Sequence, residues 1–397
     1  MTDTQTNGIH YNPFTFETQH NPYPAYRRMR DEAPVFRHPE LGFYALTRYA
    51  DVMAAHLDAA TFISSNGVTL EGGEEGQALL ITLDPPEHEW HRKVVSRVFT
   101  PRRIGGLEPF VRQIAGDLLD RARDEGRFDA VEDFSIQLPL AVIGELLGIP
   151  AEVRPQVHDL ADRLFARDES GTVSPESQHA MFELALLLHG LVVERRKSPG
   201  DDPISLMIQA EIVDDQGNGR YLTDEDLATR FLEMAFAGHE TVARLIANGI
   251  VALHWYPDQR RELVNDRSLL PQAVEEMLRW DAPSHYQGRW CTRDVELHGT
   301  TIPADSRVLL VTGAANHDDR QYVEPELFEI HRQFDRPVSF GFGVHLCIGA
   351  ALARLETRVA FDEMFDRFPD YDIDESGITR MRSSNVRGLA NLPVVAR

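Results

Sequence analysis

The chain has 397 residues, of which 42% are hydrophobic and 26% are charged, a composition typical of a globular protein with enough apolar material for a core. Its 40 Lys and Arg residues against 63 Asp and Glu residues give a formal net charge of −23, which argues against a broad cationic surface for nucleic acid. The sequence shows no signal-peptide pattern, no apolar run of membrane-spanning length, and no disulfide framework from its two cysteines. We therefore expect a cytoplasmic protein that binds neither nucleic acid nor membrane.

Helical periodicity predominates along the chain. Apolar residues recur at helical spacing between Leu107 and Ala122, and Gly126 is placed to stop that helix. Another helix is expected to end within "GELLGIP" at 144–150. Strand-like runs are fewer, and they cover 43–48, 294–299 and 307–313.

Two segments rich in glycine, serine and acidic residues, 67–80 and 167–178, are expected to be surface loops, because helix-like sequence resumes soon after each of them. Neither is expected to link two domains, since the composition does not change along the chain. The sequence therefore predicts one domain over residues 1–397, mainly α-helical with small β-sheets.

The longest predicted helix begins after Thr223, a suitable N-cap, and continues to about His254. Its middle contains "AFAGHETV", where Gly238 costs a helix about 1 kcal/mol relative to alanine and Thr241 can bond back to a carbonyl. Two interpretations remain open from these residues. One is a kink or local opening of the helix, and the other is a helix crossing that requires a small residue.

The stretch "SFGFGVHLCIGAALAR" places Cys347 between glycines, directly before a predicted helix with Leu352, Leu355 and Val359 on one face. A dinucleotide-binding loop is excluded, because the glycine spacing and the position near the C-terminus are wrong. A lone cysteine is most often a small buried residue. Here the N–H groups of the following helix favour a thiolate, and a single axial bond to haem iron suits it better than a zinc site, for which no ligand cluster is visible.

The same stretch resembles the haem-binding loop of the cytochrome P-450 family, with its F-x-x-G-x-x-x-C-x-G pattern. Further matches support this resemblance: "EEMLR" is similar to the family's ExxR helix, "AGHET" to its oxygen-binding groove, and "DPPEHEWHRKVVSRVFTPRR" to the segment entering the helix that grips the haem propionates. The similarity spans almost the whole chain and is strongest to soluble bacterial members. It implies the cytochrome P-450 fold, with a long central helix over a haem b.

The resemblance also implies roles for individual residues. Cys347 would bind the iron within a loop that includes Phe340 and Gly349. The propionates, which need cations or strong donors in an apolar pocket, would be held by His88, Arg92, Arg289 and His345. A structural ion network would join Glu276, Arg279 and Arg332. In the central helix, Ala237 and Gly238 would make room for O2, while Glu240 and Thr241 would manage protons.

The sequence departs from the family pattern in ways that bear on the substrate. Val242 stands where many bacterial relatives carry a second threonine, so no backup hydroxyl is expected there. The turn before Arg289 is expected to bring Ser284 or His285 near the haem edge, which suggests a substrate with a polar handle. Phe236, Ala237 and loop 67–80 should line the rest of the pocket. Glu233 either reaches the pocket as well or lies on a solvated face, and the solvated face is the favoured alternative.

The resulting expectation is a monooxygenase that inserts one oxygen atom from O2 into a small hydrophobic molecule. A peroxide-driven peroxygenase or decarboxylase, and a non-catalytic haem-based ligand sensor, are the alternatives. Because the haem fold would fill the chain and no phosphate-binding loop is visible, electrons should come from a separate ferredoxin and ferredoxin reductase. The basic segment 91–103, "HRKVVSRVFTPRR", is the expected docking site.

Overall fold

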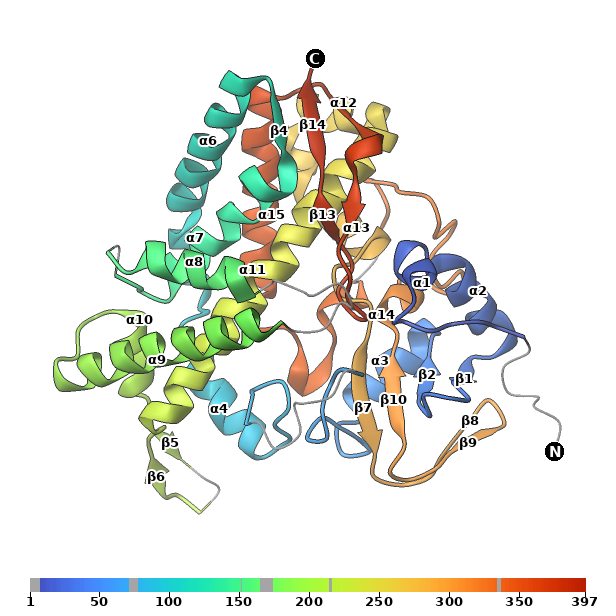
Figure 1. Ribbon diagram of the computed structural model, residues 1–397. Helices are drawn as coiled ribbons and strands as arrows, with labels where there is room; N and C mark the ends of the chain where they lie inside the picture. Colours follow the sequence, from blue (N-terminus) through green and yellow to red (C-terminus); the bar gives the residue numbers. More distant parts are fainter. Residues whose placement is uncertain (1–7, 71–77, 151, 165–173, 214–215, 334–336) are drawn as a thin grey trace.

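Helices surround one long helix, α11, and the largest sheet lies to one side of them together with the N-terminal helices (Figure 1). The computed structural model describes residues 8–70, 78–150, 152–164, 174–213, 216–333 and 337–397. The predicted fold class, mainly α with small sheets, is confirmed.

The helices and strands have the following bounds. The α-helices are α1 (Phe16–His20), α2 (Tyr23–Glu32), α3 (Tyr49–Leu57), α4 (Glu87–Ser96), α5 (Pro101–Gly106), α6 (Glu108–Glu125), α7 (Gln137–Leu146), α8 (Arg154–Leu164), α9 (Pro175–Lys197), α10 (Pro203–Ile208), α11 (Asp224–Trp255), α12 (Pro257–Asn265), α13 (Leu270–Trp280), α14 (Thr312–Ala315) and α15 (Ala350–Arg367). The strands are β1 (Val35–Arg37), β2 (Tyr44–Leu46), β3 (Phe62–Ile63), β4 (Arg127–Asp129), β5 (Ile212–Val213), β6 (Gly219–Arg220), β7 (Gln287–Cys291), β8 (Val295–Leu297), β9 (Thr300–Ile302), β10 (Arg307–Leu310), β11 (Tyr371–Ile373), β12 (Thr379–Arg380), β13 (Leu389–Asn391) and β14 (Pro393–Ala396).

α11 begins and ends where the sequence predicts. The Thr223 side chain accepts from the backbone N–H of Asp226, and the Asp226 side chain accepts in return from the backbone of Thr223, which forms a capping box. The helix is unbroken through 235–242, so the predicted local opening is absent. A Cβ added to Gly238 would lie 3.1 Å from Cδ1 of Ile143 in α7. Gly238 therefore lets α11 and α7 pack closely where they cross.

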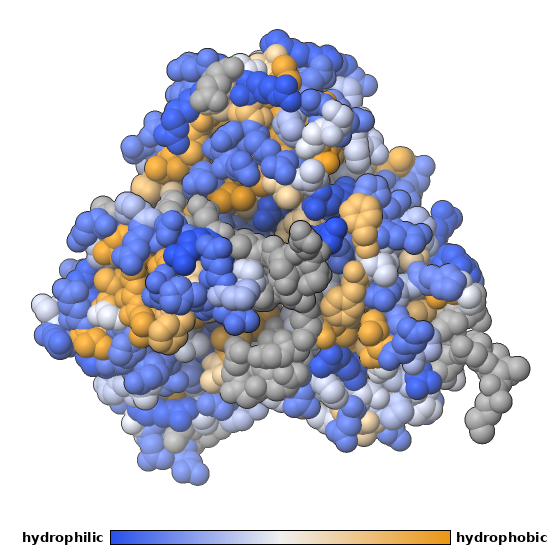
Figure 2. Space-filling view, in the orientation of Figure 1, coloured by the Kyte–Doolittle hydropathy of each residue, from blue (hydrophilic) through white to orange (hydrophobic). Residues whose placement is uncertain are grey.

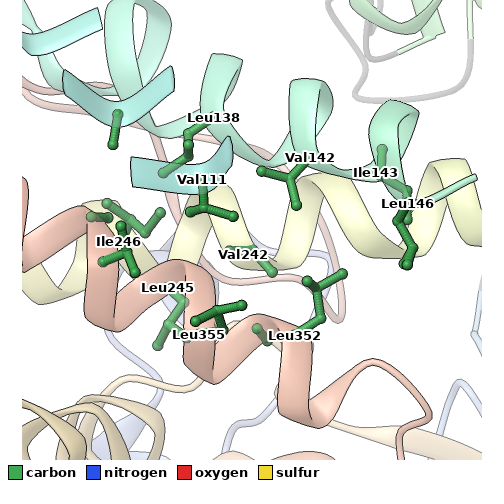
Figure 3. Close-up of a cluster of buried hydrophobic side chains, with 14 of the residues drawn as sticks. Val111, Leu138, Val142, Ile143, Leu146, Val242, Leu245, Ile246, Leu352 and Leu355 are labelled. Atoms are coloured by element: carbon green, nitrogen blue, oxygen red, sulfur yellow. The ribbon is translucent and has the colours of Figure 1, made fainter. Parts of the chain in front are cut away.

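The core is built where α11 runs between α7 and α15, with α6 alongside (Figure 3). Val242 points into this apolar cluster, so the position that lacks a hydroxyl is used for packing. Burial of such side chains stabilises the fold by roughly 1.5–3 kcal/mol each. Its labelled members are Val111, Leu138, Val142, Ile143, Leu146, Val242, Leu245, Ile246, Leu352 and Leu355.

α6 agrees with its predicted extent, and Gly126 ends it in the left-handed conformation at φ 71°. α7 ends at Leu146, within the predicted stop signal. The loop prediction for 167–178 is wrong in part, because α9 begins at Pro175, while 165–173 lie outside the described residues. Loop 67–80 has no helix or strand in its described parts, and 71–77 lie outside them.

The largest sheet has the strand order β1-β2-β10-β7-β3, with β10 parallel to β2 and antiparallel to β7. The strand prediction for 307–313 is too long, because the chain turns after Leu310 into α14. The run 294–299 instead forms a separate hairpin, in which β8 pairs with β9. β7 carries Arg289 toward the interior and ends at Cys291.

The surface keeps some apolar side chains, among them Met181, Phe182 and Leu186 on α9. Figure 2 shows orange surface over this part of the molecule. Among the described helices, none combines the length and the apolar character needed to cross a bilayer.

Candidate active site

The cysteine loop, residues 338–349, joins two short 3₁₀ turns, Val338–Phe340 and Gly343–His345, to the start of α15. Gly341 and Gly343 have φ of 66° and 68°, which a side chain would disfavour. A Cβ on Gly343 would also lie 2.6 Å from the backbone oxygen of His56 in α3. The Cys347 N–H donates to the carbonyl of Phe340 at 2.9 Å, so the loop closes on itself and presents the cysteine in a fixed place.

Two opposing effects act on the Cys347 thiol. Burial raises its pKa, while the backbone N–H groups of Gly349 and Ala350 and the guanidinium groups of Arg92 and Arg354 oppose that rise. The side chain nevertheless keeps exposed surface. A metal cation bound to this exposed sulfur would hold it as a thiolate.

Basic side chains gather around this loop. Arg92 in α4 donates to the carbonyl of Leu346, and the His88 and His345 rings lie 4.2 Å apart between centroids. Nε2 of His345 lies 3.2 Å from the Ser64 hydroxyl. We call Arg92, Arg289, His56, His88 and His345 the cationic cluster.

Several donors of the cationic cluster have no hydrogen-bond partner among the described residues. Both ring nitrogens of His56 and both of His88 are buried and unbonded, and burial lowers the pKa of these rings to about 3 and about 4. Arg289 is 3% exposed, donates to its neighbour Gly288, and has its pKa lowered by burial to about 10. Unbonded donors in a buried site favour an anionic ligand.

His56 was not found by sequence reasoning. It comes from the last turn of α3, far from the motifs, and its ring lies 3.4 Å from where a Cβ of Gly341 would be. Arg289 contributes to the lowered pKa of His56. Nothing in the helical pattern around "MAAHLD" distinguishes this histidine from an ordinary core residue.

The three residues of the predicted ion network meet. Glu276 accepts from Arg279 at 2.7 and 2.8 Å and from Arg332 at 3.2 Å, and neither Glu276 nor Arg279 has exposed side-chain surface. The two arginines also donate to carbonyls between Asn316 and Leu327. The network therefore fastens α13 to the irregular chain that leads to the cysteine loop.

On α11, the predicted oxygen-side residues form one turn and a half. The Thr241 hydroxyl donates to the carbonyl of Ala237 at 2.9 Å, as the sequence suggested for a mid-helix threonine. Glu240 is buried, and its Oε1 lies 3.7 Å from Nη2 of Arg244. Arg244 was missed, although a single arginine in the apolar run "VARLIANGIVAL" was a signal.

The prediction of a solvated face for Glu233 is wrong. Its side chain is 17% exposed, its Oε2 lies 3.1 Å from Nη1 of Arg230, and its Oε1 accepts from the N–H of Leu80 at 2.5 Å. Arg230 also donates to the carbonyl of Ala78. The pair ties α11 to residues 78–81, and burial raises the pKa of Glu233 to about 7.

The remaining residues predicted to line the pocket lie in different surroundings. Ser284 is half-buried, pairs with Val386 through an isolated β-bridge, and its hydroxyl accepts from Gln287 at 2.7 Å. His285 is buried in a different cluster, where Nδ1 lies 3.1 Å from the Tyr26 hydroxyl. Phe236 is half-buried on α11. Of the two alternatives, Ser284 is the better candidate, and its place in the pocket stays a prediction.

The donor set suits a haem. A single cysteine with backbone N–H groups behind it can supply one axial bond, and the unbonded donors of the cationic cluster match two carboxylates. Within the described residues, no group of three His, Cys, Asp or Glu side chains could hold a metal ion. A haem therefore fits the residues present.

Comparisons with known proteins agree with this geometry. The sequence model of the family described as Cytochrome P450 matches residues 170–370. The chain is 36% identical to "Putative cytochrome P450 123" of Mycobacterium tuberculosis over 389 residues, 96% of each chain. It is 37% identical to the vitamin D(3) 25-hydroxylase of Pseudonocardia autotrophica over 406 residues, 99% and 98% of the two chains.

The chain is also 35% identical to the cyclomarin C epoxidase of Salinispora arenicola over 379 residues, 94% and 95% of the two chains. The solved structure of cytochrome P450 CYP109Q5 from Chondromyces apiculatus matches with a TM-score of 0.88 at 31% identity, over 98% of both chains. CYP109E1 from Bacillus megaterium, solved in complex with corticosterone, matches with a TM-score of 0.86 at 32% identity, over 96% of this chain and 99% of that one. On this evidence the chain belongs to the cytochrome P450 family and is a haem-thiolate monooxygenase.

Proposed function

We propose that this monooxygenase inserts one atom of O2 into a C–H or C=C bond of a small hydrophobic substrate, and that its electrons come from a separate ferredoxin reduced by a ferredoxin reductase. In this reaction the substrate gains one oxygen atom, and the other leaves as water after taking up two electrons and two protons. The observation that carries the proposal is the Cys347 thiol at the start of α15, which is backed by the N–H groups of Gly349 and Ala350. The guanidinium of Arg92 and the unbonded rings of His56 and His88 lie around the same loop.

Haem b would be held by Cys347 at the iron and by His88, Arg92, Arg289 and His345 at its carboxylates. His56 would add a further donor near the same charges. Haem supplies the redox chemistry with O2, and an axial thiolate favours O–O cleavage. The protein contributes the fixed cysteine loop, the neutralising charges and a water-poor environment.

Proton delivery is assigned to Thr241 and Glu240. The Thr241 hydroxyl is already oriented by its bond to Ala237 O, so its oxygen can accept or pass a proton on the open side of the helix. Glu240 is adjacent in sequence and buried, as a relay carboxylate requires. Ala237 is exposed one turn before Thr241, which leaves room beside the hydroxyl.

The substrate is proposed to be hydrophobic with one polar handle. The relatives include a vitamin D(3) hydroxylase and an epoxidase, and the neighbour CYP109E1 was solved with corticosterone, so steroid-like compounds are the first probes to try. Ser284 offers a hydroxyl beside Val386 for such a handle. Compounds that enter the site should shift the haem absorption spectrum.

Ferredoxin docking is proposed at the basic segment 91–103. This segment lies beside the cysteine loop, because Arg92 contacts Leu346 and a Cβ on Gly349 would lie 4.0 Å from the Phe99 ring. Lys93, Arg97 and Arg102 are exposed and form no ion pair with another described residue. An acidic ferredoxin would meet a local positive patch there, despite the net charge of −23.

The proposed function is tested at Thr241. With a steroid that shifts the haem spectrum, Thr241→Ala should keep substrate binding but divert most electrons into hydrogen peroxide, lowering product per electron about tenfold. Thr229 offers a matched control, because its hydroxyl makes the same bond, 2.9 Å to Glu225 O, on an exposed turn of α11. An unchanged product yield in Thr241→Ala would remove the proton-delivery role.

A further inference from the structure

Arg244 is a charged residue in an apolar part of α11. From Val242 to Leu253 every side chain is buried, and apart from Arg244 and Asn248 all are apolar or glycine. The Arg244 and Glu240 side chains are 7% and 8% exposed, with 3.7 Å between Nη2 and Oε1. A buried guanidinium costs free energy unless it is paired, so its presence beside the relay carboxylate calls for a reason.

The arginine is itself fixed from outside the helix. Its Nη1 donates to the carbonyl of Leu389 in β13 at 2.6 Å. A Cβ on Gly388 would lie 2.4 Å from Cδ of Arg244, so the backbone of the C-terminal strand lies directly on the arginine stem. The arginine is therefore held by the C-terminal strand as well as by α11.

Asn248, one turn further along the same face, makes a comparable contact without touching Glu240. Its Nδ2 donates to the carbonyl of Asp281 at 3.0 Å and to that of Arg387 at 3.4 Å. Both residues thus attach α11 to the chain around 387–389. Only Arg244 also pairs with the predicted proton relay, which makes Asn248 a structural control.

We propose that Arg244 is a positioning residue for proton delivery: its guanidinium pairs with the Glu240 carboxylate and holds it in one place on α11. The proposal rests on the proposed role of Glu240. A positive charge about 4 Å from the carboxylate attracts it and limits the positions that the Glu240 side chain can take. In agreement with this pairing, burial lowers the pKa of Arg244 and Glu240 opposes that change.

The consequence concerns how reduced oxygen leaves the protein. O2 that takes up two electrons and two protons with its O–O bond intact leaves as hydrogen peroxide. Timely delivery of two more electrons and two more protons cleaves that bond and gives water. A carboxylate that is no longer held in place by Arg244 should relay protons from solvent more slowly. More peroxide per O2 consumed is therefore expected when the guanidinium is removed.

The experiment measures hydrogen peroxide formed per O2 consumed by the haem-loaded protein, reduced by a ferredoxin and its reductase with no added substrate. We expect Arg244→Gln to raise this ratio about threefold and Arg244→Lys, which keeps the charge, to restore at least half of the difference. The Asn248→Ala variant should give the parental ratio. The ferrous carbonyl spectrum should stay unchanged in all three variants.

A double variant separates this proposal from the role of Glu240. If Arg244 acts through Glu240, Glu240→Gln combined with Arg244→Gln should match Glu240→Gln alone. A parental ratio in Arg244→Gln alongside a changed one in Glu240→Gln, or multiplicative effects in the double variant, would overturn the role of Arg244. A parental ratio in Glu240→Gln would overturn the relay role itself, and the proposal with it.

Discussion

The two sides of the site are built in opposite ways. On the thiolate side, the cysteine loop has two glycines with positive φ and a carbonyl of α3 against one of them. Around it lie Arg92, Arg289 and the rings of His56 and His88, whose nitrogens have no hydrogen-bond partner among the described residues. On the oxygen side, an unbroken helix carries two ion pairs between its own residues, Glu233 with Arg230 and Glu240 with Arg244. The first side has unbonded polar groups and an irregular backbone, while the second has paired charges and a regular backbone.

This difference indicates which changes the protein should tolerate. Alterations on the thiolate side should affect the presence and spectrum of the haem, because backbone geometry and ligand charge are set there. Alterations on the oxygen side should leave the haem in place and change the fate of electrons or the response to pH.

The largest effect is expected from replacing Cys347, the proposed iron ligand. Cys347→His should abolish the red-shifted Soret band of the ferrous carbonyl complex and the monooxygenase activity, because a neutral imidazole cannot replace the thiolate. Absorption spectra of the reduced protein under carbon monoxide provide the measurement. Cys291→Ser is the control: this thiol is buried at the end of β7, burial raises its pKa to about 11, and its loss should leave the spectrum unchanged. A surviving band in Cys347→His would show that another residue binds the iron.

The support of the cysteine loop should give the next largest effect. Glu276→Gln leaves two buried guanidinium groups without a countercharge and should lower the free energy of unfolding by about 3 kcal/mol in denaturant titrations. The adjacent Glu275, whose side chain is 22% exposed, pairs with Arg354, which is 35% exposed, so Glu275→Gln should cost less than about 1 kcal/mol. Equal losses in the two variants would contradict a special role for the buried network.

The oxygen side should respond to pH through Glu233. Because burial raises the pKa of Glu233 to about 7, the folded protein retains a proton that the unfolded chain releases near its ordinary value. This contribution to stability is fully present below about pH 4.5 and is lost as pH rises through 7. From pH 5 to 7, the parent should lose about 2 kcal/mol in free energy of unfolding relative to Glu233→Gln.

Several charged and polar groups lie near Glu233 and act on its pKa. Arg230 faces it directly, with the N–H groups of Leu80 and Ile81, and Arg230 in turn faces Asp226, Glu87 and His91. Because the parent and Glu233→Gln share these groups, their own titration should cancel when the two free energies of unfolding are subtracted. Parallel stability curves over this pH range would show that Glu233 titrates normally.

The smallest expected effect concerns the outer surface of the thiolate side. Reversing Arg97 and Arg102 to Glu should slow reduction by a ferredoxin several-fold at low salt and flatten its salt dependence, without changing the carbonyl spectrum. Reversing Arg37 in β1 and Arg123 in α6 changes the net charge equally at other exposed places, and should leave a much smaller effect. Equal reduction rates in the two double variants would place the partner elsewhere.

Sequence reasoning was most successful where a turn or an ion network requires certain residues at fixed spacing. The glycine-framed Cys347, the capped start of α11 and the partners of Glu276 are such cases, because their geometry depends on residues near one another or on strong charge pairs. The roles of Glu240 and Thr241 were implied by the family resemblance, and they stay predictions.

The remaining parts depend on contacts that a linear pattern does not contain. Glu233 looked solvated, but residues 78–81, about 150 positions earlier, cover it and donate their N–H groups to it. His56 reaches the cysteine loop from α3, and the 307–313 run turns helical where Gly313 meets the His285 ring. Each of these outcomes was decided by tertiary packing.

The buried network of Glu276 also bears on the order of folding. Between α14 and the cysteine loop, the described chain from Asn316 to Gln333 forms no helix or strand, and its carbonyls at Asn316, Pro325 and Leu327 are bonded by Arg279 from α13. Those contacts join residues 37 to 48 positions apart, so they cannot form locally. We expect this stretch to become ordered only after α13 has docked. The loop that holds the haem would then be among the last parts of the chain to take its final shape.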